Sequence, residues 1–259
     1  MAQAAGRLGI GIIGAGKVGP ILGAALAGAG HAIVGIAATS ERNLERASAI
    51  LPDVPVLDIP TLVERSELVI LAIPESEIES FAAGVAAAGV WQPGQLVMHT
   101  APGLGYGALA PALAAGAIPL AVHPAMVFTG TSLDLTRLHE AYCAVSAPTP
   151  VLPIAQALVV EMGAEPIVVA ENERAAWAEA VSTATSFSAA IVGQSLDLLA
   201  QVGVDNPARV LGPLLRSSVE SALAGARVHA IDLSLTEPAA PNPSPFDPDS
   251  SYDSPEDPS

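Results

Sequence analysis

The sequence predicts an α/β protein in which a doubly wound, mostly parallel sheet is followed by a small all-α domain and a disordered, acidic, Pro-rich tail. Three observations lead to this prediction. A glycine-rich motif follows a short apolar run, apolar runs then alternate with helical patterns to about residue 170, and only helical patterns follow before the tail. Such an alternation is typical of βαβ units that build a parallel sheet.

The glycine-rich motif has the spacing G-x-G-x-x-G, with Gly14, Gly16 and Gly19 between the apolar run 8–13 and a helical pattern. In a dinucleotide site the first glycine makes a tight turn, the second lets backbone N–H groups approach a pyrophosphate, and the third allows close packing of helix on sheet. The other interpretation is an ordinary turn in a glycine-rich chain. The strand before it and the helix after it favour a Rossmann-type site. Its phosphate loop would comprise Gly14, Ala15, Gly16, Lys17, Val18 and Gly19.

The strands are predicted from apolar runs that end at turn residues. The run 68–73 is continuously apolar, as a central strand covered on both faces would be, and Pro74 ends it. Glu75, Glu77 and Glu79 then suit a helix start, where carboxylates interact favourably with the helix dipole. The crevice of the sheet is expected at the carboxyl ends of the strands. The predicted strands are 8–13, 33–37, a weaker one at 54–57, 68–73, 96–100, 120–123, 142–146 and 166–169.

The helical patterns define the remaining organisation. The first helix follows the glycine motif and ends at Gly28-Ala29-Gly30, and another is expected at 154–162. A long alanine-rich helix is predicted for 172–202, and a second starts at Asp205-Asn206-Pro207, where a capping side chain precedes a proline. The tail is too poor in apolar groups to offset its ordering entropy. We therefore expect a sheet domain at 1–170, a helical domain at 171–235 and a disordered tail at 236–259.

Composition limits the classes of partner. The net charge of −16 argues against nucleic acid and against an anionic membrane surface, because both attract basic surfaces. The single cysteine, Cys143, excludes an intramolecular disulfide and lies in an apolar run that favours a buried thiol over a nucleophile. No segment has the pattern of a cleaved leader or a membrane span, so a soluble, cytoplasmic protein is expected.

The choice of cofactor depends on the end of the second strand. An enzyme that uses NAD usually places an acid there to hold the ribose hydroxyls, but this strand ends at Ala37-Ala38. Thr39, Ser40 and Arg42 follow, and hydroxyls with a guanidinium suit a ribose phosphate, which favours NADP. Glu41 leaves NAD open, since its carboxylate could bind the ribose. Lys17 could shield the pyrophosphate or face water.

Two histidines are candidate proton donors. His99 closes one predicted strand and His123 the next, so both would lie at the carboxyl edge of the sheet near a nicotinamide. The structural alternative is that each ring binds backbone groups in its turn. A metal site is not expected, because no pair of ligands has suitable spacing beside a carboxylate or thiol.

The long predicted helix carries a polar strip. Glu179, Ser182, Thr183 and Ser186 share one face at helical spacing, and such a strip could bind a polar substrate. Glu179 and Ser186 are therefore further catalytic candidates. The alternative is that the hydroxyls bond back to the helix at a helix–helix contact.

Several segments together resemble a family of bacterial proteins that pair a Rossmann-like NADP-binding domain with a helical domain of unknown function. They are the glycine motif, Leu71-Ala72-Ile73-Pro74-Glu75, the turn from His99 to Gly103, and above all the segment 123–131, His-Pro-Ala-Met-Val-Phe-Thr-Gly-Thr. The wider group contains 6-phosphogluconate dehydrogenase-like, ketopantoate reductase-like and pyrroline-5-carboxylate reductase-like enzymes. The resemblance covers about residues 7–230 and implies NADP-dependent oxidoreduction of a small molecule.

The resemblance also implies roles for residues of the crevice. Ala72, Ile73 and Pro74 would lie on the nicotinamide ribose side, and Thr100 to Gly103 near the ring. Arg174 matches the family pattern of the long helix. A Tyr-His pair and an Asn of that pattern fall here on Trp177-Ala178 and Ser186, so the chain either has lost these groups or uses Glu179 and Ser186 instead. Ketopantoate reductases place a lysine in the helical domain, whereas the only lysine here is Lys17.

These inferences converge on an oxidoreductase that transfers hydride from NADP to a small carbonyl or imine, with a ketopantoate-like 2-oxo acid as the favoured substrate. Catalysis would rest mainly on positioning, with an acid supplying the proton. The alternative is an inactive NADP-binding sensor or structural protein. Small helical domains of this kind often pair, so a homodimer is expected.

Overall fold

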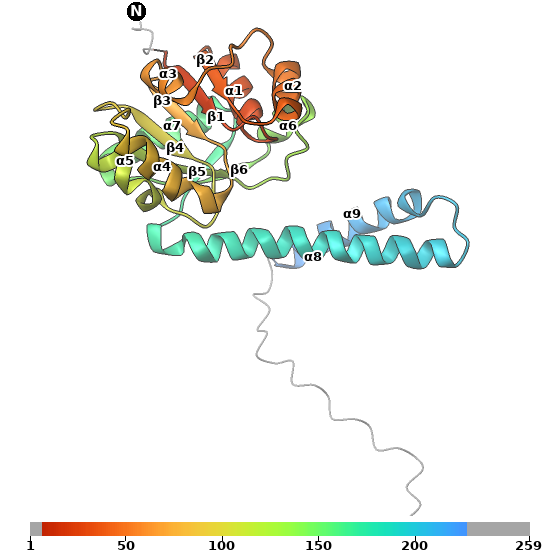
Figure 1. Ribbon diagram of the computed structural model, residues 1–259. Coiled ribbons are helices and arrows are strands. Elements are labelled where there is room, and N and C mark those ends of the chain that lie inside the picture. Colours follow the sequence, from red (N-terminus) through yellow and green to blue (C-terminus); the bar gives the residue numbers. More distant parts are fainter. Residues whose placement is uncertain (1–6, 227–259) are drawn as a thin grey trace, which may run out of the picture. The chain divides into compact units, whose positions relative to one another are not determined.

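The computed structural model describes residues 7–226, and a seven-stranded sheet is its central feature (Figure 1). Along the sheet the strand order is β2-β1-β3-β4-β5-β6-β7. All neighbours are parallel except β5 and β6, which pair antiparallel. The predicted, mostly parallel α/β sheet is thus confirmed. Its strands are β1 (Gly9–Ile13), β2 (Ala32–Ala37), β3 (Leu68–Leu71), β4 (Leu96–His99), β5 (Ile118–Pro124), β6 (Tyr142–Ser146) and β7 (Glu165–Val168).

The strand order creates a crevice at the carboxyl end of β1. From β1 the chain passes to β2 on one side and later to β3 on the other, so connections leave in opposite directions at this point. Ile13, the last residue of β1, lies between Ala37 of β2 and Leu71 of β3. In open α/β sheets ligands bind outside such a switch point. The glycine loop follows Ile13 directly.

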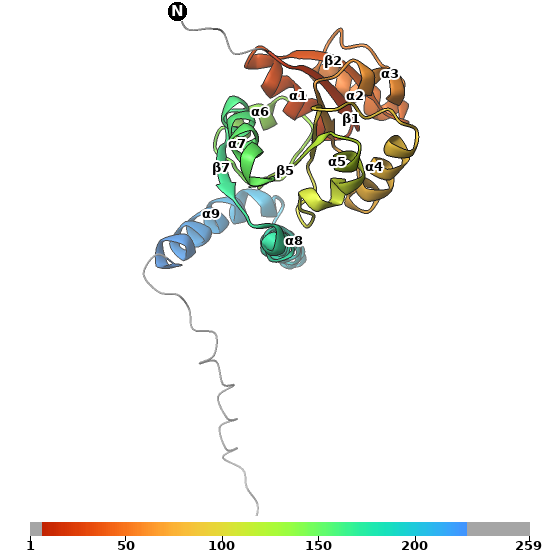
Figure 2. The same cartoon turned by 90° about the vertical axis from the view of Figure 1, so that its left-hand side faces the viewer.

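Helices cover both faces of the sheet (Figure 2). On one face a buried apolar cluster joins Ile12 of β1 to Leu22 and Leu158, and on the other a second cluster joins Leu71 of β3 to Ile78. Every residue of β3 is buried, as predicted from its unbroken apolar run. The first face is covered by α1 (Gly19–Gly28), α2 (Glu41–Ile50), α6 (Leu133–Leu138) and α7 (Leu152–Glu161), and the second by α3 (Ile59–Glu64), α4 (Ile78–Ala87) and α5 (Ala110–Ala114).

The two predicted long helices are present as α8 (Arg174–Gln201) and α9 (Pro207–Ala226). The chain divides into two compact units at Ala190 and Ile191, inside α8. Between residues 7 and 226 no helix is both long and apolar enough to cross a membrane. The predicted tail at 236–259 lies outside the described residues. Short 3-10 segments connect several elements: η1 (Glu75–Glu77), η2 (Tyr106–Leu109), η3 (Thr149–Val151) and η4 (Glu171–Glu173).

The weak strand predicted at 54–57 is wrong. This segment makes one isolated bridge, between Val56 and Ile36, instead of a ladder. Pro55 has no N–H to donate, and Asp53 just before the segment has a left-handed φ of 64°.

The predicted burial of the Cys143 thiol is confirmed: its side chain is inaccessible, and burial raises its pKa to about 12.

A buried carboxylate shapes the segment that follows β5. Asp134 is inaccessible to solvent and accepts hydrogen bonds from the N–H groups of Thr129 (2.8 Å) and Gly130 (2.7 Å) and from the Thr129 hydroxyl (2.8 Å). Burial alone would raise the pKa of Asp134, but these hydrogen bonds outweigh burial and hold it below its ordinary value of 3.8. The carboxylate therefore fixes the turn at Gly130, which packs against Lys17 of the glycine loop.

We predict that Asp134→Ala lowers the free energy of unfolding by about 2–4 kcal/mol, because it leaves two backbone N–H groups without their acceptor. Asp134→Asn should cost only about 1 kcal/mol, since an amide oxygen can still accept from both. Urea denaturation at pH 7 measures both values. Asp197→Ala, at an exposed position of α8, is the control and should change stability by less than about 0.5 kcal/mol.

The same pair of variants tests the charge of Asp134. Because its folded-state pKa is lowered, the carboxylate stabilises the fold fully above its ordinary pKa, and this contribution is lost as the pH falls through the folded-state pKa. The difference between wild type and Asp134→Asn should therefore shrink below about pH 4. A difference that stays constant from pH 7 to 3 would contradict this role for the charge.

Candidate functional site

Two of the three motif glycines are required by the fold itself. Gly14 has a φ of 108°, and a Cβ there would overlap the carbonyl oxygen of Ala72. A Cβ on Gly19 would overlap the carbonyl oxygen of Gly14. By contrast, a Cβ on Gly16 would meet no atom within 4 Å. Packing explains glycine at the first and third positions, whereas at Gly16 the lack of a side chain only keeps the space above the loop clear.

The glycine loop also offers unused hydrogen-bond donors. The Gly14 N–H donates to the carbonyl of Ala37 at 2.9 Å. Within residues 7–226 no acceptor is found for the N–H groups of Ala15, Gly16 and Lys17, which lie just before α1. Backbone N–H groups at the start of a helix form a ready site for an anion such as a phosphate. The loop is therefore suited to bind a pyrophosphate.

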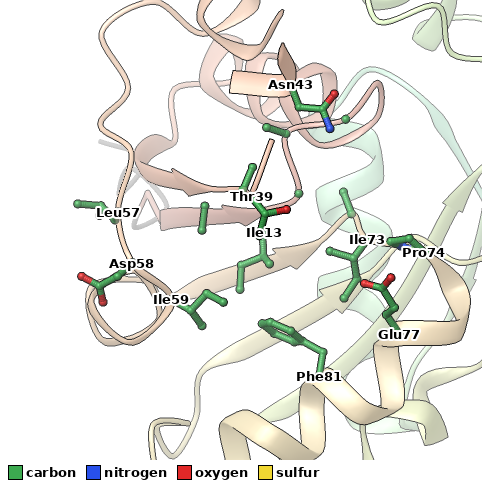
Figure 3. Close-up of a pocket in the computed structure, with 16 residues that line it drawn as sticks. Ile13, Thr39, Asn43, Leu57, Asp58, Ile59, Ile73, Pro74, Glu77 and Phe81 are labelled. Carbon is green, nitrogen blue, oxygen red and sulfur yellow. The ribbon is translucent and has the colours of Figure 1, made fainter. Parts of the chain in front are cut away.

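The loop opens into a pocket of about 810 Å³ at the crevice, which we call the first pocket (Figure 3). Ile59 of α3, Ile73 of the segment after β3 and Phe81 of α4 surround the same space, as Figure 3 shows. Such an apolar slot suits an aromatic base beside a phosphate loop. The lining residues are Ile13, Gly14, Ala15, Gly16, Ala37, Ala38, Thr39, Asn43, Leu57, Asp58, Ile59, Ala72, Ile73, Pro74, Glu77 and Phe81.

Some of the residues predicted to bind the adenosine phosphate lie here. Thr39 lines the first pocket, and so does Asn43. Asn43 was not predicted from the sequence, because its position depends on the direction in which α2 leaves the loop. Ser40 precedes α2 and its hydroxyl makes no capping hydrogen bond. Arg42 is exposed in the first turn of α2 and is not among the lining residues. The carboxylate of Asp58 accepts from Thr61 and caps α3.

A second pocket, of about 380 Å³, shares Ala72 and Ile73 with the first. It is the place where a substrate could meet the reactive end of a dinucleotide that lies in the first pocket. Lys17 and Glu75 bring one charge of each sign to its wall, and His123 brings an imidazole. The lining residues are Lys17, Val18, Ala72, Ile73, Glu75, Thr100, Ala101, Pro102, His123, Pro124, Met126 and Phe128.

The ring of His123 is hydrogen-bonded to the indole of Trp177. The Nε1–H of Trp177 donates to His123 Nδ1 at 3.1 Å, and the two rings meet edge to face with an interplanar angle of 80°. Burial lowers the pKa of His123 to about 4, and the nearby Arg174 and His99 act in the same direction. The imidazole is therefore neutral at pH 7. Trp177 was not predicted as a site residue, because its partner lies 54 positions earlier in the chain.

The structure places His99 differently. Its side chain is fully buried, Nδ1 accepts from the N–H of Ala101 at 3.2 Å, and Nε2 lies 2.8 Å from the carbonyl oxygen of Gly105. Both ring nitrogens thus bind the backbone of the following turn, and burial lowers the pKa of His99 to about 4. With no nitrogen available to a substrate, His99 supports the turn, which corresponds to the structural alternative for this residue.

Charged side chains hold the rest of this turn, residues 101–107. Arg174 is 1% exposed, and its guanidinium donates to the carbonyls of Ala101 (2.7 Å), Leu104 (2.9 Å) and Ala144 (3.2 Å). Burial lowers the pKa of Arg174 to about 10, so it remains cationic at neutral pH. Glu75 accepts from the N–H of Gly103 at 3.1 Å. Glu171 accepts from the N–H groups of Tyr106 and Gly107, at 3.0 and 2.8 Å.

The polar strip of the long helix does not reach these pockets. Glu179 and Ser186 are exposed on α8, and neither lines the first or the second pocket. The Thr185 hydroxyl donates to the carbonyls of Val181 and Ser182 within the helix. Among the described residues no three His, Cys, Asp or Glu side chains are grouped so as to hold a metal ion.

Comparison with family models gives two matches. Residues 2–124 match a Rossmann-like domain, and residues 141–240 match a domain of unknown function, DUF2520. A sequence search of curated proteins finds no match. The boundary between the two matches lies between β5 and β6, so β6, β7, α7 and the long helices belong to the second match.

Solved structures of similar fold cover nearly the whole chain. A proposed NADP oxidoreductase from Bacteroides fragilis has a TM-score of 0.68 and 18% identity, covering 83% of this chain and 80% of that one. Pyrroline carboxylate reductase from Plasmodium falciparum, solved with NADP bound, has a TM-score of 0.62 and 12% identity, covering 87% and 81%. An imine reductase from Pseudomonas sp. has a TM-score of 0.61 and 14% identity, covering 86% and 77%.

The two matches occur in the order that the sequence resemblance implies, and the structures of similar fold span both matched regions. The chain thus joins an N-terminal region that matches a Rossmann-like domain to a C-terminal region that matches DUF2520.

Proposed function

We propose that this protein is an NADP-dependent oxidoreductase that reduces a small carbonyl or imine compound. The observation that carries the proposal is the clear space above Gly16, together with the unused N–H groups of Ala15 and Gly16, two residues that line the first pocket. Without a side chain, a glycine lets a ligand approach the backbone closely. Similar structures described as an NADP oxidoreductase and as a reductase with NADP bound support the same cofactor.

The residues present fit a nicotinamide dinucleotide. The glycine loop would hold the pyrophosphate, the apolar slot at Ile59 and Phe81 the adenine, and Ala72 to Pro74 the nicotinamide ribose. Thr100, which lines the second pocket, would lie near the nicotinamide ring. When bound, the cofactor supplies the hydride, and the protein supplies binding, orientation and electrostatics.

The second pocket provides the substrate side. Met126 and Phe128 contribute apolar wall, and His123 presents its ring to the space beside Thr100. The Lys17 ammonium suits a carboxylate, which supports a 2-oxo acid of the ketopantoate type as the first substrate class to examine. Within one chain, Glu179 and Ser186 do not line this pocket. His123 does, and it is the residue proposed to contact the substrate.

We predict that Gly16→Ala abolishes NADPH binding and leaves the fold intact, because a methyl group there contacts no protein atom but occupies the space that the pyrophosphate needs. The dissociation constant should rise at least about 100-fold, measured by calorimetry. The matched control is Gly28→Ala at the end of α1, where a Cβ also meets nothing within 4 Å. Equal NADPH affinity in wild type and Gly16→Ala would refute the proposed binding mode.

Turnover separates an enzyme from a nucleotide-binding sensor. Wild-type protein with NADPH and a panel of 2-oxo acids, aldehydes and cyclic imines should lose absorbance at the wavelength of the reduced nicotinamide with at least one member, and Gly16→Ala should not. Tight NADPH binding without oxidation by any member would favour the sensor.

Preference for NADP over NAD is proposed from the loop after β2, where Thr39 and Asn43 line the pocket and Arg42 is close in sequence. We predict that Arg42→Ala weakens NADPH binding about 10- to 100-fold and NADH binding less than about 3-fold, because only NADPH carries a phosphate on its adenosine ribose for the guanidinium to bind. Glu41→Ala is the matched comparison, and it should affect neither. If Glu41→Ala weakens NADH most, the carboxylate holds the ribose and the preference is for NAD.

A homodimer is proposed from the apolar side chains of α9. Val210, Leu214 and Leu223 are each more than half exposed in the single chain. Patches of this kind on a soluble chain mark interaction sites. We predict a mass of about twice 26.0 kDa by light scattering, and the monomer mass for Leu214→Glu. Leu113→Glu, at a half-exposed position of α5, should stay dimeric, and a wild-type monomer would contradict the proposal.

A further inference from the structure

The hydrogen bond between Trp177 and His123 determines where the neutral imidazole carries its proton. An indole Nε1–H can only donate, so His123 Nδ1 must accept. In a neutral imidazole one nitrogen accepts and the other carries the proton. The proton of His123 is therefore on Nε2. Because Nδ1 faces the indole of α8, Nε2 is the ring nitrogen left for a ligand in the second pocket.

The surroundings of His123 disfavour a second proton. An imidazolium would carry hydrogen on Nδ1 and place it against the Trp177 N–H, which would break the hydrogen bond. Arg174 and His99 lie close enough to oppose a positive charge, and Lys17 shares the pocket wall. The one carboxylate of that wall, Glu75, already accepts from the N–H of Gly103. Burial adds to these effects and lowers the pKa of His123 to about 4.

We infer that Trp177 is a positioning residue that keeps His123 as a neutral hydrogen-bond donor at Nε2, and that this donor selects a carbonyl oxygen over a protonated imine. The inference rests on the proposed function and names its substrate class. A carbonyl oxygen accepts the Nε2–H, whereas an iminium N–H is itself a donor and would meet a second donor. The Nε2–H of His123 needs only a carbonyl oxygen as its acceptor. Aldehydes and ketones therefore fit this donor, whether or not they also carry a carboxylate.

Reduction of a carbonyl in this pocket does not require His123 to become an imidazolium. A bound reduced nicotinamide would supply hydride to the carbonyl carbon, the C=O electron pair would move to oxygen, and the Nε2–H of His123 would stabilise the developing negative charge. That oxygen would then take a proton from a water molecule, which leaves as hydroxide. The nicotinamide would be oxidised and the carbonyl reduced to an alcohol, while His123 would end in the protonation state in which it began.

The test uses the ¹⁵N-labelled full chain without any substrate. Long-range ¹H–¹⁵N spectra report which nitrogen of each histidine is protonated, and the His123 signals are those lost in His123→Asn. We expect His123 to show only the Nε2–H form and not to titrate between about pH 8 and 5. In Trp177→Phe, which keeps the aromatic packing, both tautomers should appear and His123 should titrate at a higher pH.

Trp91→Phe is the matched control, because the Trp91 Nε1–H also donates a buried hydrogen bond, at 3.1 Å, but to the carbonyl of Ala82. It should leave the His123 spectrum unchanged. Wild-type His123 protonated on Nδ1, or titrating near its ordinary 6.5, would overturn the inference even if Trp177→Phe does not fold.

Activity provides a second readout. With the best carbonyl substrate, Trp177→Phe should lower kcat about 10-fold at pH 8 with KM changed less than about 3-fold, and activity should recover as the pH falls, because an imidazolium again carries hydrogen on Nε2. An equal loss at every pH with an unchanged tautomer would indicate a merely structural role and overturn the inference. If protonated cyclic imines are reduced faster than any carbonyl, the substrate class is wrong. If nothing oxidises NADPH while the spectra are as expected, the proposed function fails and the tautomer assignment stands.

Discussion

The site depends on one buried cation, the guanidinium of Arg174. A buried charge is costly unless its hydrogen bonds are satisfied, and Arg174 meets this condition with backbone carbonyls from the turn after β4 and from β6. Each buried side-chain nitrogen and oxygen of the described residues has a partner. Glu171, three positions earlier, holds the other end of the same turn. One short stretch, from Glu171 of η4 to Arg174 at the start of α8, thus fixes the turn that forms part of the wall of the second pocket.

Polar groups that look alike in the sequence have different roles in this arrangement. Two histidines close neighbouring strands, but His99 points into the turn and uses both nitrogens there, while His123 on β5 keeps one nitrogen for the pocket. The difference follows from the turns. The chain after β4 curls back over the end of its strand, so Gly105 reaches His99, whereas the chain after β5 is drawn toward the glycine loop by Asp134.

Local patterns explain why much of the fold was predictable from sequence. Runs such as 68–71 are apolar because both faces of β3 are covered, and the glycine spacing reflects a single strand-to-helix turn. Predictions that needed distant partners were less complete. The contact of Trp177 with His123 spans 54 positions, and Asn43 reaches the pocket only through the direction of α2. The strand expected at 54–57 was wrong because the prediction followed its apolar residues, although Pro55 has no N–H to donate to a ladder.

The electrostatics of the second pocket follow from the same packing. Arg174 and Lys17 bring positive charge to its surroundings, and nearby positive charge disfavours an imidazolium but favours negative charge on a bound oxygen. The preorganised donor of His123 therefore acts in a field that already suits the charge that develops on a carbonyl oxygen. Glu75 keeps its negative charge in the same wall, but it is not among the groups that shift the pKa of His123. The groups that hold the turn rigid are thus also the groups that set the chemistry of the pocket beside it.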